Sequence, residues 1–520
     1  MKHIFIYGPP GSGKTTVGKI LAQKFGYGFI DLDENIRSSA GIGIPQLMKQ
    51  HGEAAFRDIE SNELKKICQT TSQKRSVVSL GGGALLREAN RDDCERSGTI
   101  IFLDAVKETL LSRIGKKDTT RPLLDGDVST SLGQLLEDRK EHYASFSFRI
   151  ASKLGKSASM IAKEIQNELG LYTLRSMGRP YDVQIRSGAI SQLSVYLDDI
   201  GVGLGDSLVV VFDTNTQLHY GKLIQEHLEQ GNRPVKIVVL PHGEENKTLE
   251  SIKVLWEAFI QAGMDRKSVV IAVGGGVTSD LVGFAASTYM RGCRWVCLPT
   301  TLLSMVDASI GGKTGFDLPQ GKNLIGSFYP PELVLIDPEL LKTLPKDEFI
   351  SGMAEVVKHG IIADSALFED CSLGLDHINA NLTDIIKRAV RVKVDVIEED
   401  PYEKGKRASL NLGHTIGHAV EIESEFKLKH GEAIAIGIVA ESRLAEKMGL
   451  AELGLTEKII AVFETLKLPT SLPMEMNRPR IIGFMKNDKK KSGNAVHFAL
   501  PIKIGTVRTG IAIGNLEETL

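Results

Sequence analysis

The sequence predicts an α/β protein of three domains: a parallel sheet covered by helices, a Rossmann-like α/β domain, and a mostly α-helical domain. Its 520 residues exceed what a single hydrophobic core supports. In the earlier part of the chain, short apolar runs alternate with segments of helical periodicity, as in parallel sheets with crossover helices. Beyond Pro338, long helical patterns dominate. We therefore expect domains at residues 1–170, 171–337 and 338–520.

The first domain opens with a strand and a helix on either side of a glycine-rich turn. Ser157 is placed to cap a last helix that ends at Leu169, and Gly170 then stops it. We expect strands at His3–Tyr7, Ser76–Leu80 and Thr99–Leu103, and a first helix at Thr15–Phe25.

The second and third domains differ in the period of their apolar residues. Strands of the second domain are expected at Tyr181–Arg186, Ser207–Phe212, Val235–Leu240, Ser268–Val273 and Trp295–Leu298. Helices of the third domain are expected at Glu348–Ile362, Leu382–Glu399, Gly413–Glu423, Glu432–Met448 and Thr456–Leu466.

The composition is that of an ordinary globular protein, with 42% hydrophobic and 25% charged residues. A net charge of -2 argues against a general nucleic-acid binder. No apolar run approaches the roughly 20 residues of a membrane span, and the N-terminus lacks the pattern of a signal peptide. We expect a cytoplasmic protein whose five cysteines are reduced, with Cys293 and Cys297 serving as packing residues.

The turn Gly8–Thr15 has the spacing of a P-loop between a strand and a helix. Its glycines let backbone N–H groups face phosphate oxygens at a helix N-terminus, where the helix dipole adds to the attraction. Lys14 would neutralise the β- and γ-phosphates, and the Thr15 hydroxyl suits Mg²⁺. The alternative is a glycine-rich turn without a ligand.

Two carboxylates, Asp31 and Asp33, follow the next expected strand on one side of an extended chain. One could hold Mg²⁺ through water and the other could accept a proton from a hydroxyl group. The alternative is a polar strand end with a helix cap. Further along are the cationic residues Arg57 and Arg139, and Gly81–Gly83, which closes the third expected strand.

Together with the P-loop, these residues resemble shikimate kinase over essentially the first 170 residues. The resemblance implies that Asp33 acts as the base or orients the acceptor hydroxyl. It also implies that Arg121, in a lid at Thr119–Leu124, closes over the phosphates. The run Ala144–Phe148 departs from the family by lacking an acidic residue. Shikimate would be held by Asp33, Arg57, Gly81, Gly82, Gly83 and Arg139. ATP with Mg²⁺ would be held by Gly11, Ser12, Gly13, Lys14, Thr15 and Thr16, with Thr15 and Asp31 at the metal.

In the second domain, Gly274–Gly276 lies between an expected strand and an expected helix. That arrangement allows close backbone approach to a pyrophosphate, although the spacing is not the usual dinucleotide fingerprint. Asp213, at the end of the preceding strand, could accept a hydrogen bond from a ribose hydroxyl and so favour NAD⁺.

Three histidines gather late in the chain at His414, His418 and His430. His414 and His418 are four residues apart, so they share one face of a helix. Two readings follow: a pair of zinc ligands, or two hydrogen-bonded core histidines. The spacing alone does not choose between them.

The segments Pro299–Asp307, Ser309–Thr314, Gly321–Gly326 and Gly352–Gly360, with the histidine cluster, resemble 3-dehydroquinate synthase from about Tyr181 to the end. The resemblance assigns the metal, zinc or alternatively cobalt, to Glu355, His414 and His430, and turns His418 towards the substrate. Ser279 stands where the family usually has glycine. NAD⁺ would be held by Asp213, Asn215, Glu244, Lys247, Gly275, Gly276, Val277, Asp280, Thr300, Thr301, Lys313, Lys322 and Thr343.

The same resemblance implies conversion of 3-deoxy-D-arabino-heptulosonate 7-phosphate to 3-dehydroquinate and phosphate. A hydride is lent to NAD⁺ and returned, phosphate is eliminated, and an internal aldol step closes the carbocycle. The catalytic set would be Lys358, His418, Arg407, Asn411, Lys393, Glu403 and Asp307. The substrate would also be bound by Arg291, Lys313, Asn323, Lys358 and Lys489.

Other readings stay open from the sequence. Related sugar-phosphate cyclases and polyol dehydrogenases share the second pattern, and another P-loop acceptor, such as a nucleoside or gluconate, fits the first. A scaffold with one decayed site is a third reading. We expect small-molecule substrates, no nucleic acid, no membrane, and a homodimer through the synthase half as the resemblance implies.

Overall fold

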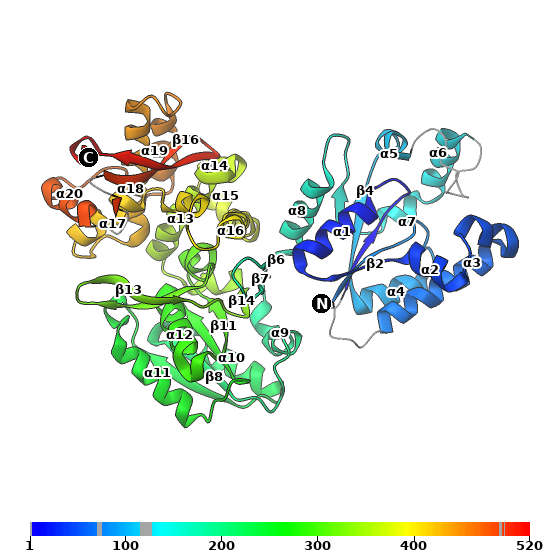
Figure 1. The fold of residues 1–520 in the computed structure, drawn as a ribbon, viewed down its shortest axis with the longest axis horizontal. Helices are drawn as coiled ribbons and strands as arrows, with labels where there is room; N and C mark the ends of the chain where they lie inside the picture. The colour runs from blue at the N-terminus through cyan, green and yellow to red at the C-terminus, as the bar shows by residue number, and fades with distance from the viewer. Residues whose placement is uncertain (1–2, 70–74, 115–126, 488–490, 493–494, 520) are drawn as a thin grey trace. The chain divides into compact units, whose positions relative to one another are not determined.

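The computed structural model describes residues 3–69, 75–114, 127–487, 491–492 and 495–519. Contacts divide the chain into two compact units, Met1–Leu169 and Gly170–Leu520, which we call the first unit and the second unit (Figure 1). Every strand and helix bounded above lies within two residues of an observed element. The predicted α/β class is confirmed for both units.

The first unit is built on a five-stranded parallel sheet of order β2-β3-β1-β4-β5. Its central strand β1 is buried along its whole length, because helices cover both faces and leave no polar side. Ser157 caps the last helix as predicted, its hydroxyl accepting from the Met160 N–H at 3.2 Å. The strands are β1 His3–Tyr7, β2 Gly28–Asp31, β3 Ser76–Ser79, β4 Gly98–Asp104 and β5 Arg149–Ala151. The helices are α1 Lys14–Phe25, α2 Leu32–Ala40, α3 Ile44–Gln69, α4 Glu88–Ser97, α5 Lys107–Ile114, α6 Val128–Asp138, α7 Lys140–Ala144 and α8 Ala158–Leu169.

The second unit begins with a seven-stranded sheet of order β6-β7-β14-β11-β10-β8-β9, parallel except for β6. Cys293 and Cys297 are buried in its core as predicted. An antiparallel hairpin, β12–β13, lies outside this sheet and was not predicted. The strands are β6 Leu171–Leu174, β7 Tyr181–Ile185, β8 Leu208–Asp213, β9 Val235–Leu240, β10 Val269–Gly274, β11 Arg294–Pro299, β12 Lys313–Leu318, β13 Gly321–Phe328 and β14 Leu333–Ile336. The helices are α9 Leu193–Asp199, α10 Thr214–Gln230, α11 Leu249–Gln261 and α12 Gly276–Thr288, with short turns η2 Ala189–Gln192, η3 Glu244–Asn246, η4 Tyr289–Arg291, η5 Ser304–Ala308 and η6 Pro338–Thr343.

The rest of the second unit is a helical array that packs on a small sheet (Figure 1). The sheet is antiparallel, of order β15-β16-β17, and it adds strands that the sequence reading did not predict. The helices are α13 Lys346–Ala363, α14 Ser365–Ser372, α15 Leu375–Ala380, α16 Leu382–Glu399, α17 His414–Glu423, α18 His430–Lys447, α19 Leu455–Thr465 and α20 Arg478–Asn487, with turns η7 Lys406–Asn411 and η8 Leu516–Thr519. The strands are β15 Lys491–Ser492, β16 Ala495–Lys503 and β17 Thr506–Ile513.

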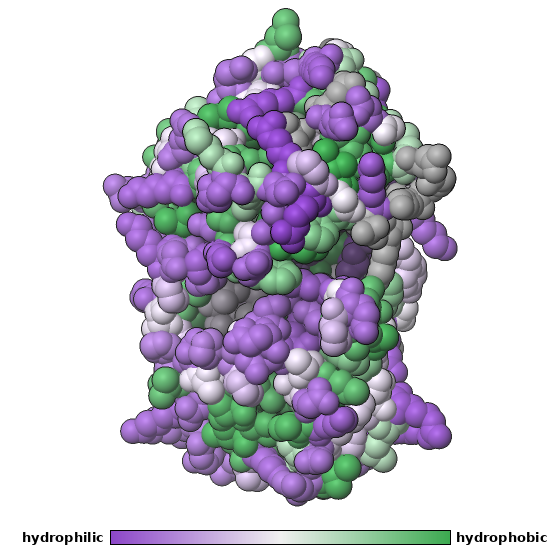
Figure 2. Space-filling view, turned by 90° about the vertical axis from the view of Figure 1, so that its left-hand side faces the viewer, coloured by the Kyte–Doolittle hydropathy of each residue, from purple (hydrophilic) through white to green (hydrophobic). Residues whose placement is uncertain are grey.

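The outer surface is mixed in character. Figure 2 shows one face on which hydrophilic side chains form a broad band across the middle, while hydrophobic ones gather in smaller groups. Within the described part of the chain, no helix is both long enough and apolar enough to traverse a membrane.

Candidate active sites

The P-loop of the first unit connects the buried strand β1 to helix α1. Gly8, Gly11 and Gly13 have φ values of 148°, 80° and 98°, a region that favours glycine. A Cβ on Gly8 would lie 2.6 Å from the carbonyl oxygen of Leu103, so no side chain fits there. These glycines therefore allow the backbone shape in which N–H groups can face an anion.

Lys14, Thr15 and Asp31 meet at the end of this loop. The Lys14 ammonium donates to the carbonyl oxygens of Gly8 and Pro9 at 2.9 and 3.0 Å. The Thr15 hydroxyl donates to Asp31 Oδ2 at 2.8 Å and lies 3.3 Å from the Ser79 hydroxyl. The ammonium suits a nucleotide phosphate bound by the loop. The hydroxyl and carboxylate oxygens next to it suit the Mg²⁺ that accompanies the nucleotide.

The predicted acceptor residues converge on the glycine turn after β3. A Cβ on Gly83 would lie 2.6 Å from Arg57 Nη2, and one on Gly81 would lie 3.2 Å from Asp33 Oδ1. Arg139 Nη1 donates to the Gly82 carbonyl at 2.8 Å. Two arginines and a carboxylate thus surround one glycine turn, which suits an acceptor with a carboxylate and hydroxyl groups. Arg121 and the whole predicted lid, Thr119–Leu124, lie outside the described residues.

Glu60 is a member of this group that the sequence reading missed. Its carboxylate is buried and accepts from Arg57 Nη1 at 2.7 Å. Burial raises the pKa of Glu60, although Arg57 opposes the shift. The three-residue spacing of Arg57 and Glu60 on α3 was the one available signal, and it looks like any helical ion pair. The run Ala144–Phe148, which departs from the family pattern, contains the buried Phe146. The Arg91 guanidinium lies over the Phe146 ring, 4.5 Å from the ring centre.

In the second unit, the predicted dinucleotide residues lie at the carboxyl ends of neighbouring parallel strands. Asp213 ends β8, Gly275 follows β10 and Thr300 follows β11. Ligands of open α/β sheets bind at this edge. A Cβ on Gly274 would lie 2.4 Å from the Thr278 hydroxyl, so the turn must be glycine for α12 to start so close. The Ser279 hydroxyl donates to the Gly276 carbonyl at 2.9 Å, which accommodates the departure from the family.

Asp213 has a second role as a helix cap. Its Oδ1 accepts from the N–H groups of Asn215 and Thr216, both at 2.9 Å, and Oδ2 lies 3.4 Å from the Thr278 hydroxyl. The cap uses mainly one oxygen, so the other can meet a ribose hydroxyl. The Thr301 hydroxyl accepts from the Ser304 N–H at 3.1 Å, which fixes the turn beside Gly275.

Lys247 joins three other predicted residues beside this edge. Its ammonium, in a residue only 4% exposed, donates to Asp280 Oδ2 and to Asn323 Oδ1, each at 2.7 Å. Glu244 lies further away, at 4.0 Å from the same ammonium. Burial raises the pKa of Asp280 to about 6, while Lys247 works in the opposite direction.

The hairpin β12–β13 carries two further predicted lysines. Lys313 donates to Glu403 Oε2 at 2.6 Å, and Asn411 donates to Glu403 Oε1 at the same distance. Lys322 reaches Glu421 Oε1 at 2.9 Å and Glu244 Oε1 at 3.4 Å. The hairpin therefore links the sheet edge to the helical array, a connection that the sequence did not reveal.

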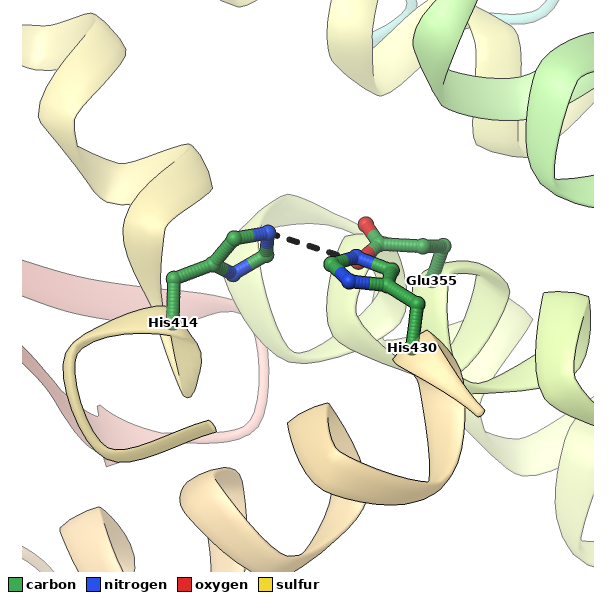
Figure 3. A group of neighbouring side chains, drawn as sticks. All are labelled: Glu355, His414 and His430. Atoms are coloured by element: carbon green, nitrogen blue, oxygen red, sulfur yellow. Dashed lines mark ion pairs between the residues drawn. The ribbon is translucent and has the colours of Figure 1, made fainter. Parts of the chain in front are cut away.

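Glu355, His414 and His430 converge from three different elements (Figure 3). Glu355 lies inside α13 and is 0% exposed, while His414 and His430 are the first residues of α17 and α18. Nε2 of each histidine lies 3.7 Å from Glu355 Oε1. The structure thus groups His414 with Glu355 and His430 rather than pairing it with His418. His418 is exposed, with its ring centre 5.0 Å from that of His414.

These three side chains fit a divalent metal. Within the described residues, the Glu355 oxygens accept no hydrogen bond of ordinary geometry, although the Lys358 ammonium lies against them. His414 Nδ1 lies 3.1 Å from the Leu412 carbonyl, which leaves Nε2 for a metal. One carboxylate and two imidazoles with an open fourth position are a common catalytic zinc set.

The charges around Glu355 include two buried cations. Burial alone would raise the pKa of Glu355, but Lys358 and His430 bring it below its ordinary value. Lys393 donates to the Asp307 carboxylate and carbonyl, both at 2.6 Å. Burial and the Lys358 charge lower the pKa of the nearby His359 to about 3, so its imidazole is neutral at pH 7. His359 was not predicted as part of the site.

Other predicted residues have their contacts elsewhere. Arg407 is buried and donates to the Gly311 carbonyl at 3.2 Å. The Thr343 hydroxyl shares a hydrogen bond with the Tyr220 hydroxyl. Arg291 is exposed with a φ of 64°, and among the described residues no hydrogen bond or ion pair joins it to the remaining predicted site. Lys489 lies outside the described residues.

Lys393 gives a prediction for pH dependence. Burial lowers the pKa of Lys393 to about 8, although Asp307 opposes the shift. If its ammonium binds substrate, kcat/KM should fall as pH rises through about 8. The folded state also binds fewer protons than the unfolded state between about 8 and the ordinary lysine value, so the free energy of unfolding should rise with pH in that window.

The measurement is a kcat/KM profile from about pH 7 to 10 for the parent and for Lys393→Arg, whose guanidinium stays charged throughout. The alkaline limb should vanish in the variant. An identical limb in both proteins would assign it to another group.

Comparison with known proteins adds to this geometry. Residues 10–170 match the family model for shikimate kinase, residues 237–351 that for the 3-dehydroquinate synthase N-terminal part, and residues 352–491 that for its C-terminal part. A 3-dehydroquinate synthase of Synechocystis sp. is 43% identical over 342 residues, spanning 64% of this chain and 94% of that protein. One from Symbiobacterium thermophilum is 41% identical over 332 residues, spanning 63% and 92%.

The chain belongs to the 3-dehydroquinate synthase family. Its first unit is a shikimate kinase domain, and the protein is an enzyme with both activities, a bifunctional member of the shikimate pathway.

Solved structures resemble the second unit closely. The crystal structure of 2-deoxy-scyllo-inosose synthase complexed with carbaglucose-6-phosphate, NAD⁺ and Co²⁺ aligns with a TM-score of 0.61 at 26% identity, over 66% of this chain and 96% of that one. The structure of 2-epi-5-epi-valiolone synthase from Streptomyces hygroscopicus subsp. jinggangensis, with NAD⁺ and Zn²⁺ bound, aligns with a TM-score of 0.59 at 27% identity, over 65% and 94%. Both relatives hold a dinucleotide and a divalent metal.

Proposed function

We propose that the first unit transfers the γ-phosphoryl group of ATP to the 3-hydroxyl of shikimate. The second unit converts 3-deoxy-D-arabino-heptulosonate 7-phosphate to 3-dehydroquinate and phosphate. We also propose a boundary within the second unit at 337/338, a homodimer through that unit, and a cytoplasmic location. The observation that carries the second reaction is the convergence of Glu355, His414 and His430 beside the buried lysines Lys358 and Lys393.

In the first unit, each residue has a chemical task that its position allows. Lys14 and the P-loop N–H groups neutralise the transferred phosphoryl group, and Thr15 and Asp31 hold Mg²⁺. Arg57, fixed by Glu60, and Arg139 grip the acceptor carboxylate. Asp33 orients the hydroxyl group and takes its proton.

In the second unit, bound NAD⁺ and a divalent metal would supply reversible hydride acceptance and Lewis acidity. Lys358 and Lys393, both buried, hold substrate oxygens where shielding from water strengthens electrostatic attraction. The Asp307 carboxylate fixes Lys393. Lys313 and Asn323, with His418, face the departing phosphate, whose negative charge they stabilise.

The relatives leave one alternative for the second reaction. The two solved structures are those of a 2-deoxy-scyllo-inosose synthase and a 2-epi-5-epi-valiolone synthase, so a different sugar phosphate is the competing substrate. The greater identity to proteins named 3-dehydroquinate synthase favours the heptulosonate.

Two assays on one preparation test the proposal. Phosphate release should be far faster with the heptulosonate than with glucose 6-phosphate or sedoheptulose 7-phosphate, and ADP formation should depend on shikimate rather than gluconate or a nucleoside. NAD⁺ should be needed in catalytic and not stoichiometric amount, with no net NADH accumulation. Preference for another sugar phosphate would refute the second assignment while leaving the first intact.

A further inference from the structure

Glu421 is a buried carboxylate that none of the assigned roles uses. It lies on α17 and is 8% exposed. Its Oε2 lies 3.4 Å from His430 Nδ1, and its Oε1 accepts from the Lys322 ammonium at 2.9 Å. It therefore stands between a histidine that faces Glu355 and a lysine of the hairpin β12–β13.

The two nitrogens of His430 face different partners. Nε2 lies 3.7 Å from Glu355, whereas Nδ1 faces Glu421. A carboxylate at Nδ1 holds the proton there, so Nε2 presents its lone pair to the space between Glu355 and His414. The arrangement sets both the tautomer and the rotation of the ring. His414 obtains the same result from the Leu412 carbonyl, so each histidine has its own acceptor.

The ion pair with Lys322 determines whether Glu421 can bind a metal. Glu421, His418 and His430 could themselves form a cation site, since one donor atom of each lies within 4.8 Å of the others. The Lys322 ammonium already occupies Glu421 Oε1, and a second positive charge at that carboxylate would be repelled. Lys322 also lies over the Phe426 ring, 4.3 Å from its centre, so its position is held from two sides. Glu421 is thus an acceptor for His430 rather than a metal ligand.

We propose that Glu421 is a positioning residue that fixes the His430 imidazole for metal binding, with Lys322 holding the Glu421 carboxylate in place. The inference rests on the metal use of the proposed function. It adds the requirement that metal affinity depends on a residue that never touches the ion. Partners that orient metal-binding histidines in this way change metal affinity about 10- to 100-fold when they are removed.

The test measures metal binding rather than turnover. The full-length protein, stripped of metal, is titrated with Zn²⁺ against a chromophoric chelator and separately with Co²⁺ while its visible absorption bands are recorded. Glu421→Ala should weaken Zn²⁺ binding about 10- to 100-fold and alter the Co²⁺ bands. Glu421→Gln should weaken binding less, because the amide oxygen can still accept from Nδ1.

The matched control is Glu423→Gln on the same helix, where the carboxylate pairs with Arg480 at 3.1 Å. Its Zn²⁺ affinity should equal that of the parent. Circular dichroism checks folding, and if Glu421→Ala does not fold, Glu421→Gln and Lys322→Met carry the test, both with weaker Zn²⁺ binding expected.

Unchanged Zn²⁺ affinity and unchanged Co²⁺ bands in the folded Glu421 variants would overturn the inference. Phosphate release from the heptulosonate is assayed separately in the parent protein. A parent that binds Zn²⁺ in a Glu421-dependent way but releases no phosphate would refute the proposed reaction and leave the role of Glu421 standing.

Discussion

Replacing His414 with alanine is expected to remove metal binding and to lower kcat/KM for phosphate release by at least about 10³-fold. The reason is geometric. His414 and His430 each place Nε2 at 3.7 Å from one oxygen of Glu355, so loss of one imidazole leaves two ligands where catalytic zinc needs three. Kinase activity should be unchanged, because His414 belongs to a compact unit separate from the P-loop.

Metal content by atomic absorption and phosphate release measure this effect in the same sample. His219→Ala on α10 is the control, since this exposed histidine lies outside the metal group. Glu355→Gln is a poorer choice because Lys358, 1% exposed, would lose its buried counter-charge and the variant could unfold for that reason. Normal zinc content in folded His414→Ala would show that the metal lies elsewhere.

Replacing Lys14 with alanine should lower shikimate-dependent ADP formation by about 10²- to 10³-fold. The ammonium donates to two carbonyls of the loop, so it is already placed beside the position of the phosphates. Its removal leaves the growing negative charge of the transferred phosphoryl group without its closest fixed cation. Phosphate release by the second unit should persist at the parent rate.

Lys19→Ala on the same helix provides the control, because Lys19 is exposed and contacts the Phe29 ring rather than the loop. Loss of both activities in Lys14→Ala, in a protein with normal circular dichroism, would refute independent sites. Retention of kinase activity would mean that another cation neutralises the phosphates.

The sequence predicted the parallel sheets well because their strands are buried on both faces and read as continuous apolar runs. Strand β10, for example, is buried at every residue and was placed within one residue. Strand β17 was not predicted, for the opposite reason. Its residues alternate between exposed and less exposed positions, and only Ile513 is buried, so the strand has no continuous apolar run. The hairpin β12–β13 was not predicted for the same reason, since most of β13 is exposed.

The candidate sites show a similar limit. Lys14 lies in a P-loop motif whose local spacing carries its chemistry, so it could be named from the sequence. The metal role of His414 came from the family resemblance, because its spacing from His418 also fits two core histidines. Glu60 and Glu421 could not be named from the sequence, because each acts by orienting a neighbour, and that role depends on a carboxylate oxygen meeting a side chain in the folded state. Nothing local distinguishes Glu421 from Glu423, two residues on, which pairs with Arg480 instead.

The central claim is that one chain holds a metal-dependent cyclase and a separate kinase. The most direct measurement assays both activities in one preparation from which a chelator has removed zinc. Mg²⁺ is kept in excess over the chelator, and the NAD⁺ concentration is held constant. Phosphate release from the heptulosonate should fall to background and return on adding Zn²⁺ or Co²⁺, while shikimate-dependent ADP formation continues unchanged. Full phosphate release by protein shown to be free of transition metal would contradict the account.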